Sequence, residues 1–471
     1  MATQEHTETP TEPLGGKPPT GSQPSVPDLG YQVKYQRAFE AVLWSMPAVG
    51  MYAYWRAAAD WKEGSNTIFA WSEPATPFLE GVTGNNQTPY ILSQTDLSKG
   101  PVVVEVPAAT DKASLYGQVV DHWQISVADI GPSGVDAGKG GKILFLPPGY
   151  SGDVPSGHIV VKSASYRITF AFRSIKAAGA STADAYAYSK TLKMYYLSEL
   201  PNPAPTKFVD PVGKRFAALP RFDERWFEDV HAIFSVENAM PRDKVMMGML
   251  ASLGIEKGKP YKPDGTTKQA MRQGVIDAYH YMQETFQGMA TELAWWKDRH
   301  WADSMYTDQN REFLFETDDL MQIDRRGVHY FYGIYWPKKL VEQPATQYLM
   351  AMADKDGNPL QAGASYSLVV PGDVPVEQFW SLLVYDRETY CYIYSPQMLP
   401  GLSTFDMANM AKNDDGGVTL YFGPEAPEGL ESNWIPTSGK KPFPVMRFYG
   451  GTKEFWDRSW TMPDVELVAK K

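Results

Sequence analysis

Cysteine is nearly absent from this sequence, and the one that is present, Cys391, has no partner for an internal disulfide. It lies in the aromatic stretch YCYIY with no basic residue beside it. A reactive thiolate needs an electropositive surrounding. We therefore expect Cys391 to be a buried structural thiol, and its presence leaves the cellular compartment open.

Runs of basic residues are also missing. The 471 residues include 44 Lys and Arg against 55 Asp and Glu, which gives a formal net charge of −11. Proteins that bind nucleic acid or anionic lipid surfaces do so through concentrated basic faces. The composition therefore predicts no nucleic-acid partner and no anionic membrane surface as a partner.

No stretch is both long and apolar enough to span a bilayer. The most apolar segment, AVLWSMPAVGMYAYWRAA, contains Pro47, Gly50 and Arg56 and falls short of the ~20 residues required. We expect a buried pair of helices there and no membrane insertion. No signal peptide is visible in the sequence. The location is therefore unknown: periplasmic or secreted if a leader has been processed, and cytoplasmic otherwise.

The common hydrolase signatures are absent as well. The sequence has no G-x-S-x-G elbow, no H-E-x-x-H, no C-x-x-C and no complete P-loop. Only weaker arrangements of titratable residues therefore remain as candidates.

Apolar and aromatic residues are plentiful, at 43% and 13% of the chain, so a large core is expected. We predict a mainly β fold with a helical insert, of the α+β class. Residues 1–30 are rich in Pro, Thr and Gly and are expected to form a disordered tail. A helix pair and β domain (31–205), a helical connecting segment (206–326) and a second β domain (327–471) follow from the change of hydrophobic period from two to 3.6 and back. Strands are expected to resume at GVHYFYGIYW, residues 327–336.

Alternation in two stretches predicts one apolar and one polar sheet face. In SLYGQVVDHWQISV the apolar set is Val119, Trp123, Ile125 and Val127, and the polar set is Tyr116, Gln118, His122 and Gln124. In GHIVVKSASYRITFAFRSI the polar set is Ser163, Ser165, Arg167, Thr169 and Arg173. A β-sandwich or barrel with one polar-lined side fits both patterns.

Several separated motifs suggest a family. FEAVLWSMP, NNQTPY, DLSKGPVVVEVP, YGQVVDHW and PPGYSGDVPSGHIVVKSASYR resemble, in this order, the family called domain of unknown function 1254. SYSLVVPGDVPVEQFWSLLVYD, ESNWIP and PVMRFYGG look like its companion, domain of unknown function 1214. The resemblance covers roughly residues 37 to 465 and implies two jelly-roll-like β-sandwich domains joined by helices. It also implies a hydrolase of organic esters or phosphotriesters, an activity reported for some members.

Two pairs of residues have spacings that would suit a divalent metal, which is the only cofactor that we consider. Glu228 and His231 stand three residues apart, and His280 and Glu284 stand four apart, so each pair would share a helix face. Solvated or capping side chains have the same spacings, so both interpretations stay open.

Buried charges raise a similar choice. Asp121 lies among apolar neighbours, and a buried carboxylate needs a charged or multiply hydrogen-bonded partner. We expect Arg167 or Arg173 to pair with it, because the resemblance places family arginines there. In the C-terminal third Asp386, Asn433 and Arg447 match the companion family's motifs, and for each of them a structural ion pair and a functional role remain open.

The loop NNQTPY, residues 85–90, is either a structural turn or part of a ligand site. Asn85 and Asn86 are typical turn residues, yet amide and phenol groups at a strand mouth also suit a pocket. We expect an aromatic-lined pocket that binds a small, partly apolar organic substrate. The predicted catalytic residues are Tyr90, His122 and Arg167, and the predicted substrate-binding residues are Asn85, Asn86, Tyr116, Gln118, Trp123 and Arg173.

Two functions of different classes follow. The first is a hydrolase-type enzyme acting on an ester or phosphotriester, and the alternative is a non-catalytic protein whose sandwiches bind carbohydrate, lipid or protein. An enzyme needs a titratable group, an electrostatic stabiliser and a shielded cavity close together. We also expect that the chain could form a homo-oligomer.

Overall fold

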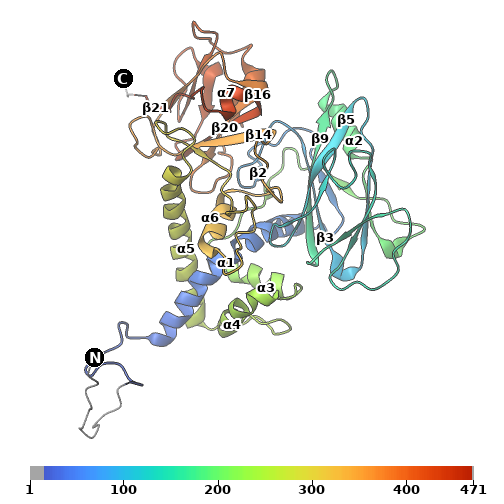
Figure 1. The fold of residues 1–471 in the computed structure, drawn as a ribbon, viewed down its shortest axis with the longest axis vertical. Coiled ribbons are helices and arrows are strands. Elements are labelled where there is room, and N and C mark those ends of the chain that lie inside the picture. The colour runs from blue at the N-terminus through green and yellow to red at the C-terminus, as the bar shows by residue number, and fades with distance from the viewer. Residues whose placement is uncertain (1–14, 469–471) are drawn as a thin grey trace, which may run out of the picture.

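A single long helix, α1 (Leu29–Asp60), runs through the middle of the structure, which is a computed structural model describing residues 15–468 (Figure 1). The expected tail is described only from residue 15, and residues 15–28 form no helix or strand. Asp28 caps α1 by accepting a hydrogen bond from the backbone N–H of Tyr31. The other fourteen residues of the expected tail lie outside the described residues.

The prediction of a helix pair in this segment was wrong. Pro47 has no N–H for the carbonyl of Leu43, which usually breaks a helix, but α1 continues through it. Tertiary contacts hold the interrupted turn in place. Gln124 donates a hydrogen bond of 2.8 Å to the Pro47 carbonyl, and Gly327 packs so closely on the Leu43 carbonyl that a Cβ there would lie 2.9 Å from it.

The N-terminal unit is a sandwich of two sheets. The larger sheet has the strand order β11 (Phe208–Val209), β1 (Ile68–Ala70), β3 (Tyr90–Asp96), β9 (Arg167–Lys176), β5 (Ala113–Asp121) and β6 (Ser126–Ile130). The smaller sheet has the order β10 (Lys193–Tyr196), β4 (Val102–Val106), β7 (Gly141–Leu146) and β8 (Ile159–Lys162). Their facing side chains, including Val104, Phe145 and Phe170, form an apolar core. Helix α2 (Thr182–Ser189) belongs to the same unit, and β2 (Leu79–Glu80) pairs with β12 (Phe216–Ala217) beside it.

The C-terminal unit is a second sandwich. Its larger sheet has the order β13 (Trp301–Asp303), β14 (Thr346–Ala351), β20 (Pro442–Gly451), β16 (Val376–Asp386) and β17 (Gly401–Ser403). The smaller sheet has the order β19 (Trp434–Pro436), β18 (Val418–Gly423), β15 (Tyr366–Val370) and β21 (Glu466–Leu467). Leu368, Leu382 and Met446 belong to the core between the two sheets. Short 3-10 helices and α7 complete the chain: η1 (Leu97–Lys99), η2 (Leu197–Glu199), η3 (Pro241–Asp243), η4 (Thr404–Asp406), η5 (Glu431–Asn433) and α7 (Lys453–Trp456).

Helices pack around α1 between these sandwiches. They are α3 (Trp226–Phe234), α4 (Lys244–Ser252), α5 (Gly265–Glu292) and α6 (Ile323–Tyr332). The expectation of a strand at residues 327–336 was wrong, because residues 327–332 belong to α6. The aromatic side chains there are buried among other helices, so tertiary packing outweighs their preference for strands. The predicted class, α+β with two β-sandwich units and a helical segment, is confirmed.

A further apolar core joins the three parts. It contains side chains from the helices together with residues from the outward faces of both large sheets, such as Leu92 on β3 and Val445 on β20. Figure 1 shows β3 and β9 on one side, and β14 and β20 above the helices. The outer faces of the two large sheets therefore face a shared interior region, and the candidate site lies there.

Candidate functional site

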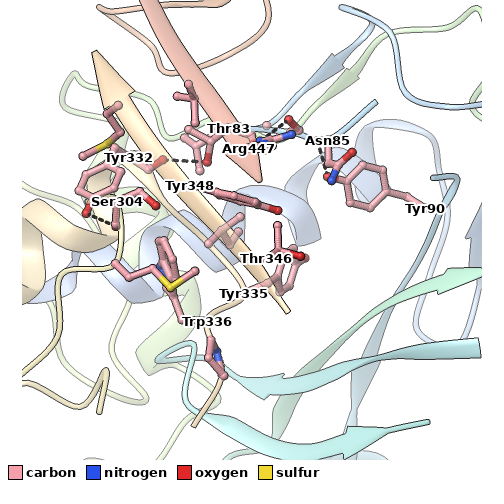
Figure 2. A pocket seen from close by; sticks show the side chains of 18 of the residues that line it. Thr83, Asn85, Tyr90, Ser304, Tyr332, Tyr335, Trp336, Thr346, Tyr348 and Arg447 are labelled. Atoms are coloured by element: carbon pink, nitrogen blue, oxygen red, sulfur yellow. Dashed lines mark hydrogen bonds between the residues drawn. The ribbon is translucent and has the colours of Figure 1, made fainter. Parts of the chain in front are cut away.

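A cavity of about 320 Å³ lies between the large sheets of the two sandwiches (Figure 2). Strands β3 and β9 contribute Tyr90, Leu92 and Arg173, and strands β14 and β20 contribute six more lining residues: Thr346, Tyr348, Met350, Phe443, Val445 and Arg447. The remaining walls come from residues 81–85 and from a segment without helix or strand, residues 333–345, which we call the wall segment. Five single residues complete the lining: Tyr54, Leu79, Ser304, Met305 and Tyr332. The volume falls within the range of about 300–1,000 Å³ that is typical of ligand pockets.

On the N-terminal side, Tyr90 and Arg173 form a cation–π pair. They are register partners in the antiparallel strands β3 and β9, so their side chains lie on the same face. The Arg173 guanidinium carbon lies 3.4 Å from the centre of the Tyr90 ring. Its Nη1 donates to the carbonyl oxygen and the hydroxyl of Thr88, at 2.9 and 3.3 Å. These contacts hold the guanidinium at the edge of the cavity.

On the C-terminal side, Arg447 is buried, with 1% of its surface exposed. Its Nη2 donates to the carbonyl oxygens of Thr83 and Gly84, each at 3.0 Å, and to the Tyr385 hydroxyl at 2.6 Å. The guanidinium lies over the ring of Tyr348, 4.6 Å from its centre, as Figure 2 shows. A single nitrogen of Arg447 therefore joins the C-terminal sheet to a loop of the N-terminal unit.

The other two nitrogens of Arg447, Nε and Nη1, have no hydrogen-bond partner among residues 15–468. The same holds for three further groups on the cavity lining: the Ser304 hydroxyl, the Tyr335 hydroxyl and the Trp336 indole N–H. Buried polar groups are almost always satisfied in native proteins, so unsatisfied ones point to an absent water, ion or ligand. All of these groups can donate a hydrogen bond, and the residues that carry them line one cavity.

Charge is distributed unevenly around the cavity. Its described lining includes two arginines but no Asp, Glu, His, Lys or Cys. Neither Arg173 nor Arg447 belongs to an ion pair within residues 15–468. Burial lowers the pKa of Arg447, but the tyrosines around it, Tyr385 first, raise that pKa above its ordinary value. Both guanidinium groups are therefore cationic at neutral pH.

The wall segment contributes aromatic side chains in a constrained backbone. Trp336 packs against Phe313 and His329 and lies so near Gly333 that a Cβ there would be 2.2 Å from its ring. Tyr335 has a φ of 61°, in the left-handed region that bulky residues rarely adopt. Burial raises the pKa of Tyr335 well above its ordinary value. Its hydroxyl therefore stays protonated at neutral pH and remains a donor.

The polar loop is both a structural turn and part of the cavity. Asn85 lines the cavity, while its side-chain oxygen accepts from the Gln87 N–H at 2.7 Å and its amide donates to the Tyr449 hydroxyl at 3.0 Å. The Tyr90 hydroxyl accepts from the Asn85 N–H at 2.8 Å. Asn86 does not line the cavity, and its side-chain oxygen accepts from Gln87. The loop is therefore a hydrogen-bonded turn at Asn85 and Asn86, and it also contributes Asn85 and Tyr90 to the cavity lining.

Among the predicted site residues, Asn85, Tyr90 and Arg173 line the cavity and the others do not. His122 is buried against Trp123 and Phe234, and its Nδ1 contacts the Ser165 hydroxyl and lies 3.7 Å from the Glu237 carboxylate. Burial, and then the charges of nearby arginines with Arg167 first, lower the pKa of His122 to about 3. His122 is therefore a neutral group in the core, outside the cavity lining.

Arg167 lies over aromatic rings of α1 rather than in the cavity. Its guanidinium carbon is 5.1 Å from the centre of the Tyr52 ring and 5.3 Å from that of Trp55, and its Nη1 donates to the Ala232 carbonyl at 2.9 Å. Tyr116 is 49% exposed. Gln118 is half-buried, with a buried side-chain oxygen that has no partner among residues 15–468.

The predicted ion pair of Asp121 was wrong. Its carboxylate accepts hydrogen bonds from the backbone N–H groups of Trp123 and Ile125, at 2.8 and 2.9 Å, and it pairs with neither Arg167 nor Arg173. Burial raises the pKa of Asp121 to about 7, and the two backbone bonds lower it in part. The turn after β5 therefore supplies the partners that we expected from a facing strand.

The two residue pairs proposed for a metal lie on helix surfaces. Glu228 on α3 is 3.5 Å from Arg221, and His231 stacks on Tyr261 while its Nε2 contacts the Lys259 carbonyl. On α5, His280 and Glu284 are exposed. Within residues 15–468 no group of three or more His, Cys, Asp or Glu side chains is arranged to hold a metal ion.

The remaining single-residue expectations concern the C-terminal third. Cys391 is buried, and burial raises the pKa of its thiol well above the ordinary value, as a structural thiol requires. Asn433 is buried and bonds to the backbone of Ala411 and Thr419. Asp386 accepts from the Glu388 N–H and lies 3.9 Å from Lys440. Within the described part of the chain, no helix is long and apolar enough to cross a membrane.

Comparisons with known proteins agree with the tandem arrangement. Residues 65–196 match the family model described as "Protein of unknown function (DUF1254)", and residues 345–453 match "Protein of unknown function (DUF1214)". The chain thus carries DUF1254 and DUF1214 in tandem. Within the curated proteins, no match to the chain was found. Tyr90 and Arg173 fall within the first matched range, and Tyr348 and Arg447 fall within the second.

Two solved structures are similar over most of the chain. The crystal structure of the VPA0106 protein from Vibrio parahaemolyticus covers 93% of this chain and 100% of its own, with a TM-score of 0.53 and 18% identity. An uncharacterized protein from Burkholderia cenocepacia covers 93% of this chain and 94% of its own, with a TM-score of 0.37 and 10% identity. The first likeness supports the fold alone.

Proposed function

We propose that the protein binds a small, partly apolar organic molecule in the cavity between its two sandwiches. The observation that carries the proposal is the group of hydrogen-bond donors on Arg447, Ser304, Tyr335 and Trp336 that have no partner in the described chain and line one aromatic cavity. A ligand with acceptor atoms would satisfy these donors, and the aromatic walls would bury its apolar part.

The strained backbone at Tyr335 supports the same proposal. Residues held in sparsely populated conformations persist where the surrounding structure determines them, and they cluster at ligand sites. Tyr335 adopts its positive φ within a wall segment that otherwise has no helix or strand to fix it. Tyr335 and the neighbouring Trp336 both line the cavity, so a binding role would account for this cost.

Hydrolysis of an ester or phosphotriester is the second candidate. The two guanidinium groups favour it, since cationic donors would stabilise negative charge that develops on a reacting oxygen. The described lining contains hydroxyl groups as nucleophiles but no carboxylate, imidazole or amine to serve as a general base. Binding is therefore the better-supported function.

A thermal-shift screen tests the proposal. Aromatic and alicyclic compounds that fit about 320 Å³ should raise the melting temperature of the wild-type protein in a dose-dependent way. The same compounds should have a smaller effect on Ser304→Leu, which fills part of the cavity. A matched change outside the cavity, Ser98→Leu on η1, should respond as the wild type does. No stabilisation by any compound would contradict a binding role, and turnover in a parallel ester screen would favour the second candidate.

A further inference from the structure

We propose that the cavity selects organic anions, and that Arg447 and Arg173 bind the oxyanion head group of a ligand whose planar apolar part lies against the wall segment. This inference rests on the proposed binding function and specifies the chemical class of the ligand.

Arg447 supplies the first part of the argument. It is 1% exposed, and its Nε and Nη1 have no partner within the described residues. A guanidinium buried without a counter-charge is unfavourable. A structural clamp would account for Nη2, which bonds to Thr83, Gly84 and Tyr385. These structural bonds leave Nε, Nη1 and the positive charge of Arg447 without a partner among the described residues. A bound oxyanion would accept hydrogen bonds from the two nitrogens and neutralise the charge.

Arg173 supplies the second part. It lines the same cavity from the opposite sandwich, and within residues 15–468 only its Nη1 has hydrogen-bond partners, namely two oxygens of Thr88. The flat face of its guanidinium is covered by Tyr90, which leaves the edge for a ligand. Planar guanidinium groups are well suited to bind carboxylate, sulfonate and phosphonate oxygens.

The setting of the two arginines makes the inference specific. The chain as a whole carries a net charge of −11, yet the described cavity lining carries two positive charges and no negative one. Burial and aromatic walls reduce screening by water, so an anion inside would interact more strongly with the guanidinium groups than it would at the surface. A neutral ligand of equal shape would leave both charges uncompensated.

The apolar part of the ligand has its own surface. Trp336, Met305, Leu340 and Ile334 line the cavity beside the polar groups. Figure 2 shows Trp336 on the wall segment, away from Asn85 and Tyr90. The Trp336 indole N–H and the Tyr335 hydroxyl would reach further acceptor atoms on the ring system. A flat aromatic acid with a single ring or two fused rings matches this arrangement.

The test uses a matched set of naphthalene compounds measured by isothermal titration calorimetry. The wild-type protein should bind 2-naphthoate and 2-naphthalenesulfonate ~10-fold or more tightly than neutral 2-naphthamide, because only the anions form charge-assisted hydrogen bonds. The ratio of the two acids reports whether carboxylate or sulfonate geometry suits the site better. Arg447→Met should lower the affinity for both acids by ~10-fold or more and change that of 2-naphthamide by less than ~3-fold.

Two further variants keep the test decisive. If Arg447→Met fails to fold, Arg173→Met serves instead, because Arg173 is only half-buried. It should show the same loss of affinity for the two acids. Arg272→Met on α5 removes one positive charge from a side chain that is 66% exposed and lies outside the cavity, and it should bind like the wild type.

Equal binding of 2-naphthamide and the acids would overturn the anion inference but leave the proposed binding function intact. No binding of any of the three compounds, together with a negative thermal-shift screen, would overturn both. Acid binding that is equal in Arg272→Met, Arg173→Met and Arg447→Met would place the anion site elsewhere and overturn the inference.

Discussion

Arg447 donates a hydrogen bond of 3.0 Å to the carbonyl oxygen of Gly84, which lies 363 positions earlier in the chain. This bond joins strand β20 of the C-terminal sandwich to the residue that directly precedes the polar loop of the N-terminal unit. The Tyr385 hydroxyl, which accepts from Arg447, also donates to the Gly84 carbonyl. The two domains therefore share one buried polar junction, and the cavity lies beside it.

The junction predicts that Gly84→Ala is destabilising. A Cβ at Gly84 would lie 2.9 Å from the Tyr392 ring, so the loop or the ring must move. We expect a loss of ~1 to 3 kcal/mol in the free energy of unfolding, measured by urea denaturation. Gly64→Ala is the control, because no atom lies within 4 Å of a Cβ at Gly64, and it should change stability by less than ~0.5 kcal/mol. Equal stability of the two variants would show that the loop has room to adapt.

Asp121→Asn should gain stability relative to the wild type as the pH rises. The pKa of Asp121 is raised to about 7 in the folded state by burial, whereas it is ~3.9 in an unfolded chain. The folded protein therefore retains a proton that the unfolded chain has lost, and the contribution of Asp121 to stability, full below pH ~4, is lost as the pH rises to about 7.

The difference in free energy of unfolding, variant minus wild type, should increase by ~3 kcal/mol between pH 4 and pH 8. Denaturant titrations at each pH measure it. Asp60→Asn at an exposed position should show no such trend. A pH-independent difference for Asp121→Asn would mean that the fold does not raise the pKa of this carboxyl above its value in the unfolded chain.

Tyr90→Phe should weaken the polar loop without removing the aromatic wall. The Asn85 N–H would lose its acceptor, the Tyr90 hydroxyl 2.8 Å away. We expect a cost of ~1 kcal/mol in the free energy of unfolding, while the ring would still cover the Arg173 guanidinium.

His122→Gln should leave ligand affinity unchanged, because His122 does not line the cavity. An equal loss of affinity in both variants would favour the sequence-based hypothesis that the two residues act together.

The sequence allowed some of these relationships to be predicted. The polar loop, Tyr90 and Arg173 were candidates because asparagine, tyrosine and arginine at strand ends are typical of ligand sites, and all three parts lie within one domain. Arg447 was noted as a candidate from the resemblance. Whether it forms a structural ion pair or has a functional role depends on which loop of the other domain contacts it. Packing between domains leaves no local pattern, so Ser304, Tyr335, Trp336 and Tyr348 were missed.

The position of His122 shows why alternation failed locally. Strict alternation placed His122 on the polar face with Tyr116 and Gln118. The register of β5 and β6 shifts between Val119 and Val120, and β5 ends at Asp121. Asp121 then accepts the N–H groups of Trp123 and Ile125 in a turn, where Gln124 has a φ of 65°. The extra residue of this irregularity lies on β6, and β5 pairs with β9 without a break up to Asp121. The turn after Asp121 therefore ends the alternation, so the side chains beyond it no longer follow the strand pattern.

Trp336 should report on binding. It is the tryptophan of the described cavity lining, so a ligand that enters should change its fluorescence. We expect 2-naphthoate to change the emission of the wild type excited at a wavelength where the ligand absorbs little, and to change that of Trp336→Phe much less. Trp460→Phe removes an indole outside the cavity and should keep the wild-type response. An unchanged response in Trp336→Phe would indicate a binding site elsewhere.

The most direct test of the central claim is a crystal structure of the protein with 4-bromobenzoate, whose bromine can be located by anomalous scattering. We predict that the carboxylate lies in the cavity between the sandwiches, with an oxygen ~2.7 to 2.9 Å from Nε or Nη1 of Arg447, and that the bromine lies toward the wall segment. Bromine peaks only outside the cavity, with ordered water against Arg447 at saturating ligand, would contradict the account.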